Sequence, residues 1–189
     1  MLEETFVTGL WDEGYTLSPH LIKSVYIGED PFGNKLFDNQ RSELGQLLYD
    51  LKYGGDKTKV ADIVAMISQP ILNMFSDRKI NCVIPIPASK ERDFQPVYEL
   101  AKGIAEVLDC YYVDNILKKT NNIQSKNLDE KSLISESIIQ QKKAKRSINV
   151  LLVDDVFDTG TTANACASVL REDPNIKKIF FVALTRTKG

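Results

Sequence analysis

The sequence predicts an α/β fold with a mostly parallel central sheet, flanked by helices, and a small N-terminal hood or appendage. Three apolar runs, over 82–86, 148–153 and 179–184, have the length and uniform hydrophobicity of strands that are buried on both faces. Segments with helical spacing alternate with these runs. Strand–helix–strand connections are right-handed crossovers that place helices on both faces of a parallel sheet.

Length and composition bound the class of protein. The chain has 189 residues and a formal net charge of −2, so it suits one soluble domain that needs no disulfide or metal to fold. It contains no apolar run of the roughly 20 residues that span a bilayer, and its acidic start is unlike a signal peptide, so we expect a cytoplasmic protein that does not bind membranes. The near-neutral charge excludes a basic nucleic-acid coat, and any phosphate binding has to come from a local arrangement.

The cysteines predict no zinc site. Cys82, Cys110 and Cys166 are far apart and form no CxxC pair, and His20 is the one histidine. A structural zinc site normally takes two ligands from one tight turn. We therefore expect three small apolar residues in a reducing compartment.

Residues 1–40 are predicted to form the N-terminal hood, and residues 41–189 the α/β domain. Aromatic residues among glycine and proline dominate the first segment, and 24–37 has the pattern of a hairpin that turns at Gly33 and Asn34. Trp11 is expected to pack against the sheet, with stacking on a base as the alternative.

Helical spacing and turn residues define the remaining elements. Leucines at helical spacing end at Gly54, and a second apolar pattern is interrupted by Pro70, which should end or kink its helix. A short strand is predicted at 111–113. The expected helices cover 44–51, 60–75, 94–108 and 161–171.

The most informative segment is Val150–Thr162, which reads VLLVDDVFDTGTT. Its apolar residues form a buried strand, and Asp154 and Asp155 stand at the carboxyl end, where ligands bind in open parallel sheets. Adjacent strand residues point to opposite faces of a sheet. Only one aspartate can therefore face a ligand directly, unless a turn just after them brings both to it.

The following loop has the composition of a phosphate site. Gly160 permits a tight backbone turn, and Thr159, Thr161 and Thr162 place hydroxyls beside the free amides of a helix start, with Asp158 leading in. Such a loop binds phosphate through backbone N–H groups and the helix dipole, without basic side chains. The alternative is a simple N-cap and turn, which favours the same residue types.

Val150–Thr162 resembles the phosphoribosyl-pyrophosphate signature of type I phosphoribosyltransferases. The resemblance implies that Asp154 and Asp155 contact the ribose 2′- and 3′-hydroxyls and hold Mg²⁺, mainly through the ligand or water. It implies that 158–162 cradles the 5′-phosphate. In purine-type members the acid at the position of Asp158 lies near the base, and it is the candidate catalytic proton-transfer group.

Further segments resemble a ComF-like, amidophosphoribosyltransferase-like subgroup of that family. The resemblance covers about residues 44–187, and in the subgroup the loop that includes Ala88, Ser89 and Lys90 binds pyrophosphate. The four segments are LYDLKYGGDK (48–57), VIPIPASK (83–90), ERDFQ (91–95) and QSKNLD (124–129), the last in the loop that closes over the family's site.

Two departures from the subgroup stand out. Its members usually carry an N-terminal four-cysteine zinc module, which these 189 residues lack, and its arginine-rich loop is here largely Asn, Ser and Glu. Lys90 and Arg92 are candidates to neutralise a leaving pyrophosphate, with two solvated residues before a helix as the alternative. Lys126 or Lys131 could fold over the leaving group when the loop closes.

The resemblance implies a phosphoribosyltransferase that moves phosphoribose from phosphoribosyl pyrophosphate to a nitrogenous base or amine, with Mg²⁺ as cofactor. The alternative is a non-catalytic protein that binds phosphoribosyl pyrophosphate or a nucleoside monophosphate, or that serves DNA uptake or repair. Lys142–Arg146 is expected to be a solvated connection, with nucleic-acid binding left open. A homodimer is also left open, since dimers are common among these folds.

Overall fold

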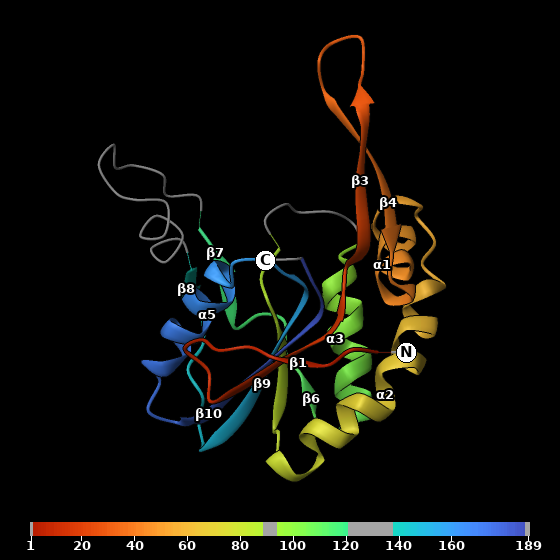
Figure 1. Cartoon of the computed structure of the whole chain (residues 1–189). Helices are drawn as coiled ribbons and strands as arrows, with labels where there is room; N and C mark the ends of the chain where they lie inside the picture. The colour runs from red at the N-terminus through yellow and green to blue at the C-terminus, as the bar shows by residue number, and fades with distance from the viewer. Residues whose placement is uncertain (1, 89–93, 121–137, 188–189) are drawn as a thin grey trace, which may run out of the picture.

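A six-stranded sheet forms the centre of the molecule (Figure 1). The computed structural model describes residues 2–88, 94–120 and 138–187. Neighbouring strands are parallel except for the β1–β2 pair at one edge, so the predicted mostly parallel sheet is confirmed. In spatial order the strands are β1 (Thr5–Phe6), β2 (Glu13–Pro19), β10 (Ile176–Arg186), β9 (Ile148–Phe157), β5 (Cys82–Pro85) and β6 (Tyr111–Tyr112).

Helices cover both faces of the sheet. Leu151 and Val153 of β9 belong to the core shared with the first three helices, whereas Val150 and Leu152 belong to the core shared with the last one. This alternation is the two-residue period of a strand, and it requires an apolar run because both faces are buried. The helices are α1 (Glu43–Tyr53), α2 (Lys59–Phe75) and α3 (Pro96–Val107) on one face and α5 (Thr161–Arg171) on the other.

Helix α2 continues through Pro70, where the sequence predicts an end or a kink. Proline removes one backbone hydrogen bond from a helix interior. Ile67 and Ile71 on either side of it are fully buried in the core between α2 and the sheet. Burial of this apolar face holds the helix together across the missing bond.

Part of the N-terminal segment belongs to the central sheet. β2 pairs with β10 over Glu13–Pro19, and Trp11 stacks on Phe181 of β10 with ring centroids 4.4 Å apart. Trp11 is thus a core residue, in agreement with the packing hypothesis. The division at residue 40 stays a prediction. The part that projects from the body is a hairpin of β3 (Leu21–Glu29) and β4 (Lys35–Arg41), close to the predicted 24–37 (Figure 1).

Smaller elements complete the described fold. A 3-10 turn, η1 (Ser76–Arg78), leads from α2 towards β5, and an antiparallel pair of β7 (Leu117–Lys119) and β8 (Ile138–Gln140) lies beside α5. Within the described ranges, no helix has the length and hydrophobicity to cross a bilayer.

Candidate functional site

The candidate site lies where β5 ends and β9 continues. Pro85, the last residue of β5, pairs with Val153, and β9 runs four residues further, to Phe157. The edge of β9 beyond Val153 is therefore open on the β5 side. A cavity of about 340 Å³ lies there, and its lining includes Lys52, Ala88, Asp154, Asp155 and Thr162.

Both aspartates reach this cavity, although the strand stays regular. Asp154 is opposite Ala183 in the β9–β10 register, and the pairing continues to Phe157, so no turn follows the two acids. Their side chains alternate, with Asp155 in the series of Leu151 and Val153 and Asp154 in that of Val150 and Leu152. The early end of β5 explains how both can border one cavity, because no neighbouring strand separates them there.

Asp155 forms an ion pair with a lysine from α1. Lys52 Nζ lies 2.6 Å from Asp155 Oδ2, and the two side chains are only 20% and 19% exposed. The Thr185 hydroxyl donates to the Asp155 carbonyl oxygen at 3.1 Å and lies 3.1 Å from His20 Nδ1. Burial and the charges of Lys52 and Arg41 lower the pKa of His20, so the neutral imidazole is favoured beside this pair.

Asp154 lies beside Asp155 in a partly buried environment. Its Oδ1 accepts the Asp155 backbone N–H at 2.8 Å. Burial, followed by the negative charge of Asp155, raises the pKa of Asp154 above its ordinary range, and the Lys52 charge only partly opposes this. Two adjacent carboxylates with one shared cation favour ligands that donate hydrogen bonds or bring positive charge.

The loop after β9 has the geometry of an anion site. Gly160 has a φ of +72°, and a Cβ at this position would lie 2.8 Å from the Phe157 ring, so both the backbone conformation and the space require glycine. Helix α5 starts at Thr161 with Gly160 as its N-cap, which has no capping side chain, and the Thr161 backbone N–H donates a long hydrogen bond to the Thr159 hydroxyl at 3.4 Å. The hydroxyls of Thr159 and Thr161 lie 2.7 Å apart beside this helix start.

Asn164 fixes this loop to the N-terminal segment. Its Nδ2 donates to the Gly160 carbonyl at 2.9 Å, and its Oδ1 accepts the Leu10 backbone N–H at 2.7 Å. Further along α5, Arg171 Nη2 lies 2.8 Å from Asp12 Oδ2. The sequence reasoning missed Asn164, because it lies two residues beyond the motif and its partners are remote in the chain.

Asp158 is turned away from this cavity. It is exposed, its Oδ1 accepts the Thr187 hydroxyl at 2.5 Å, and it is absent from the described residues that line the cavity. Its role as a proton-transfer group stays a prediction.

The predicted pyrophosphate loop is described only at its start. Ala88 lines the cavity. Ser89, Lys90, Arg92 and the segment that contains Lys126 and Lys131 lie outside the described residues.

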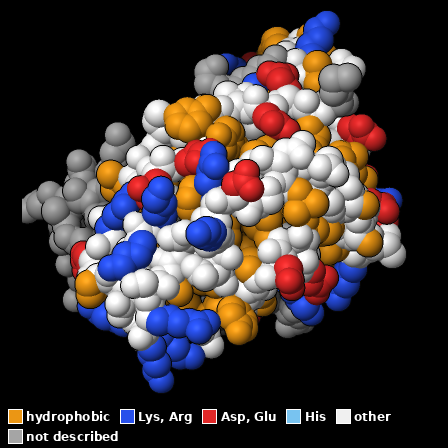
Figure 2. All heavy atoms as spheres, turned by 90° about the horizontal axis from the view of Figure 1, so that it is seen from below, with side chains coloured by type: hydrophobic (Ala, Val, Ile, Leu, Met, Phe, Trp, Pro, Cys, Tyr) orange, Lys and Arg blue, Asp and Glu red, His pale blue; other side chains and the backbone are white. Residues whose placement is uncertain are grey.

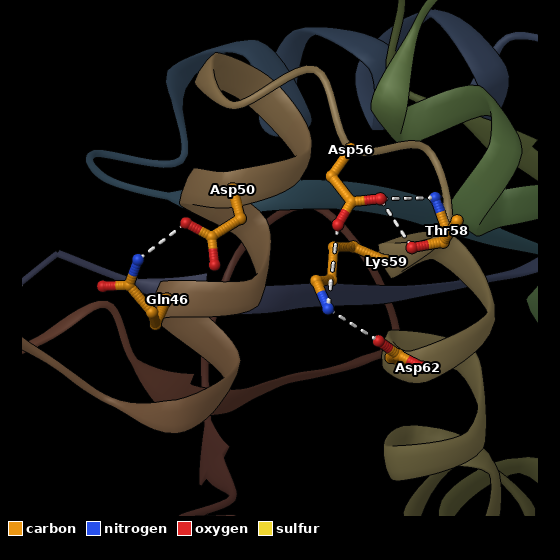
Figure 3. A network of polar contacts seen from close by, with 6 residues as sticks. All are labelled: Gln46, Asp50, Asp56, Thr58, Lys59 and Asp62. Atoms are coloured by element: carbon orange, nitrogen blue, oxygen red, sulfur yellow. Dashed lines mark hydrogen bonds and ion pairs between the residues drawn. The ribbon is translucent and has the colours of Figure 1, made fainter.

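The connection between α1 and α2 is held by a network of polar contacts (Figure 3). Asp56 accepts hydrogen bonds from the Thr58 backbone N–H and hydroxyl, at 3.1 and 2.5 Å, and lies 3.8 Å from Lys59 Nζ. Lys59 also pairs with Asp62 at 3.1 Å, within the first turn of α2. These contacts close the turn after α1, whose last residues, Lys52 and Tyr53, line the cavity. The LYDLKYGGDK segment could have indicated Lys52 by its resemblance alone.

The basic cluster Lys142–Arg146 lies far from this cavity. The segment leads from β8 into the start of β9, whereas the aspartates lie near the other end of that strand. Figure 2 shows the end of the molecule at which the parallel strands begin, with lysine and arginine side chains gathered on it. The four basic side chains of the cluster are exposed, as expected for a solvated connection.

Comparison with solved structures identifies the fold. Adenine phosphoribosyltransferase from Saccharomyces cerevisiae, solved with an imino-altritol bisphosphate and adenine, superposes with a TM-score of 0.50 at 14% identity, over 85% of this chain and 83% of that one. The enzyme of the same name from Rhodothermus marinus gives a TM-score of 0.47 at 15% identity, over 87% and 94% of the two chains. No protein-family model matches the sequence.

Comparison with curated sequences gives one relative of note. Competence protein ComFC of Bacillus subtilis is 27% identical over 143 residues, which are 75% of this chain. The chain is a ComFC homologue with a type I phosphoribosyltransferase fold. The matched region covers only 59% of the length of ComFC. The type I phosphoribosyltransferase fold that the resemblance of Val150–Thr162 implies is thereby confirmed, and the similarity to ComFC agrees with the ComF-like subgroup.

Proposed function

We propose that the protein binds phosphoribosyl pyrophosphate or a nucleoside monophosphate in the cavity beyond β5 and transfers phosphoribose to a nitrogenous base or amine. The observation that carries this proposal is that Asp154, Asp155 and Thr162 line one cavity. Thr162 belongs to the first turn of α5, so the two carboxylates and the helix start lie at the same place. The carboxylates accept hydrogen bonds from sugar hydroxyls, and the helix start accepts phosphate. One ligand that carries both groups fits this pair of features.

Each part of the site has a distinct task in this proposal. The amides of the first turn of α5 and the hydroxyls of Thr159 and Thr161 bind the 5′-phosphate without a basic side chain. Asp154 and Asp155 orient the ribose. Lys52 holds the Asp155 carboxylate in place and reduces the repulsion between the two acids. Positioning of this kind is the main contribution a protein makes to substitution at an activated sugar.

The donor atoms suit Mg²⁺ only together with a ligand. Among the described residues no group of three or more His, Cys, Asp or Glu side chains could hold a metal ion. Mg²⁺ is usually bound by one or two carboxylates together with phosphates of the substrate and water, so Asp154 and Asp155 would hold it with the bound donor. When bound there, Mg²⁺ stabilises the charge that develops on the leaving pyrophosphate.

A second candidate function is binding without turnover. The Asp158 carboxylate accepts the Thr187 hydroxyl and does not line the cavity, so among the described residues the predicted proton-transfer group does not face the ligand. A protein of this kind would sense phosphoribosyl pyrophosphate or a nucleotide. Such a sensor could serve DNA uptake, and the similarity to a competence protein is compatible with that role.

Two experiments separate these functions. Isothermal titration with phosphoribosyl pyrophosphate and Mg²⁺ should show binding that is lost in the Asp154→Asn/Asp155→Asn variant. No binding of phosphoribosyl pyrophosphate contradicts the transferase, and no binding of a nucleoside monophosphate in the same titration contradicts the sensor as well. Equal binding by the variant contradicts the assigned site. A screen of purine and pyrimidine bases for pyrophosphate release then distinguishes them, because tight binding with no turnover on any base favours the sensor.

A further inference from the structure

The β3–β4 hairpin exposes apolar side chains along most of its length. It stands clear of the body at the end of the sheet that carries the candidate site (Figure 1). Five of its apolar residues are between 40% and 62% exposed: Val25, Tyr26, Ile27, Leu36 and Phe37. Side chains alternate along a strand, so Val25 and Tyr26 lie on opposite faces of the hairpin. Tyr26 and Phe37 pair on one of these faces, with ring centroids 5.8 Å apart. An exposed aromatic pair of this kind suits a contact with a partner.

The tip of the hairpin presents one aromatic side chain from a rigid turn. Asp30 Oδ1 accepts the backbone N–H groups of Phe32 and Asn34, at 2.8 and 2.9 Å, and Asp30 Oδ2 accepts Asn34 Nδ2 at 2.8 Å. The Asp30 carboxylate is thus satisfied within the turn. Phe32, held by this turn, is 90% exposed. A preorganised aromatic side chain is typical of the anchor residues that fill a pocket on a partner.

A cavity that suits such an anchor lies at the base of the same hairpin. It has a volume of about 620 Å³, within the range of pockets that enclose organic ligands. Its lining is largely apolar and comes from the N-terminal segment, the start of β3, α1 and α2. The apolar residues are Leu2, Ile22, Leu44, Met66 and Pro70.

We propose that two copies of the chain dimerise through their hairpins, which pack side by side in opposite directions, so that each Phe32 enters the cavity at the base of the other hairpin. In each copy the nine residues of β3 separate the tip of the hairpin from its base. At about 3.3 Å per residue this separation is about 30 Å. A two-fold axis therefore satisfies both contacts at once, which is the requirement for a self-complementary interface. The hairpin faces that carry Tyr26 and Phe37 cover each other between the two anchors.

Charge complementarity favours a second copy as the partner. Lys35, exposed beside the tip, approaches the rim of the opposite cavity, where Glu4 and Glu43 are located. The strands carry Lys23, Lys35 and Arg41 against Glu29 and Asp38, and Asp30 in the turn supplies a third acid, so the hairpin has no net charge. A surface without excess positive charge does not suit nucleic acid.

Truncation of the anchor tests the proposal. We expect the wild-type chain to be a dimer by light scattering and sedimentation at micromolar concentration, and Phe32→Ser to raise the dissociation constant by about 100-fold or more, because each dimer loses two anchors. Tyr111→Ser is the matched control, since Tyr111 is a 67% exposed aromatic residue on the distant edge strand β6. It should leave the dimer unchanged, and circular dichroism should show that both variants are folded.

A charge exchange tests the orientation of the hairpins. Lys35→Glu and Glu43→Lys should each weaken the dimer, and the double variant should recover most of the affinity, because the exchanged charges meet again across the interface. A wild-type monomer at high micromolar concentration overturns the proposal and assigns the hairpin to a different protein. A dimer that survives Phe32→Ser also overturns it, since the interface then lies elsewhere.

Discussion

Lys52 Nζ, at the end of α1, lies 2.6 Å from Asp155 Oδ2, on a central strand more than 100 positions away in the chain. The contact joins helix α1, which packs on one face of the sheet, to a carboxylate that is predicted to bind ribose hydroxyls. Both side chains are about four-fifths shielded from water, so their attraction is screened less than that of a surface pair.

A double-mutant cycle measures the strength of this pair. We expect Lys52→Met and Asp155→Asn each to lower the free energy of unfolding, with a coupling of about 1 kcal/mol or more between them, because each leaves a shielded charge without its partner. The measurement is urea denaturation of the four proteins. Lys59 and Asp62, a pair at 3.1 Å whose carboxylate side chain is 53% exposed, serve as the control and should couple by no more than about 0.5 kcal/mol. Equal couplings in the two cycles contradict the assignment.

Gly160→Ala should harm both stability and phosphate binding. An alanine at φ +72° costs about 1–2 kcal/mol, and its Cβ would also meet the Phe157 ring at 2.8 Å. Displacement of the loop should weaken binding of ribose 5-phosphate by about tenfold or more, since phosphate would lose aligned amides. The control is Gly33→Ala at φ +81°, where no atom lies within 4 Å of the added Cβ. It should show the conformational cost alone and leave ribose 5-phosphate binding intact.

The raised pKa of Asp154 predicts a pH dependence of stability. Burial raises this pKa in the folded state above its ordinary value of 3.8. At pH values between the unfolded and the folded pKa, the folded protein therefore holds a proton that the unfolded chain releases. The resulting stabilisation is complete below pH 3.8 and is lost as the pH rises through the folded pKa. Asp154→Asn cannot ionise. Its unfolding free energy, measured in urea without divalent metal, should therefore fall less between acidic and neutral pH. Parallel curves for the two proteins would show that Asp154 ionises freely in the fold.

Asn164→Ala should loosen the N-terminal segment from the phosphate loop. The substitution removes the hydrogen bonds to Leu10 and Gly160, and a net loss of about 1–2 kcal/mol follows for two such bonds. Amide hydrogen exchange should speed up at Leu10, which then lacks its acceptor. Asn175, whose Nδ2 donates to Ala144 at 2.7 Å, offers a control remote from the cavity. Asn175→Ala should leave exchange at Leu10 unchanged.

Much of the fold could be predicted because it is encoded locally. The apolar run 148–153, the helical spacing of the leucines before Gly54 and the glycine turn at 158–162 each report the burial or backbone conformation of their own segment. The loop and the two aspartates therefore occupy the positions expected for a site at the carboxyl end of a parallel strand. β2 was not predicted, because its place in the sheet depends on pairing with β10 more than 160 positions away.

The sequence by itself determined the local pattern of the candidate site: paired carboxylates at the end of a buried strand, then a glycine turn into a helix. The tertiary structure decided how these residues are arranged around one cavity. β5 stops at Pro85, so both aspartates border one cavity on a regular strand, and α1 brings Lys52 to Asp155. The physical reason is that burial and turn preferences belong to short segments. Strand ends, open edges and ion pairs depend on how remote segments pack together.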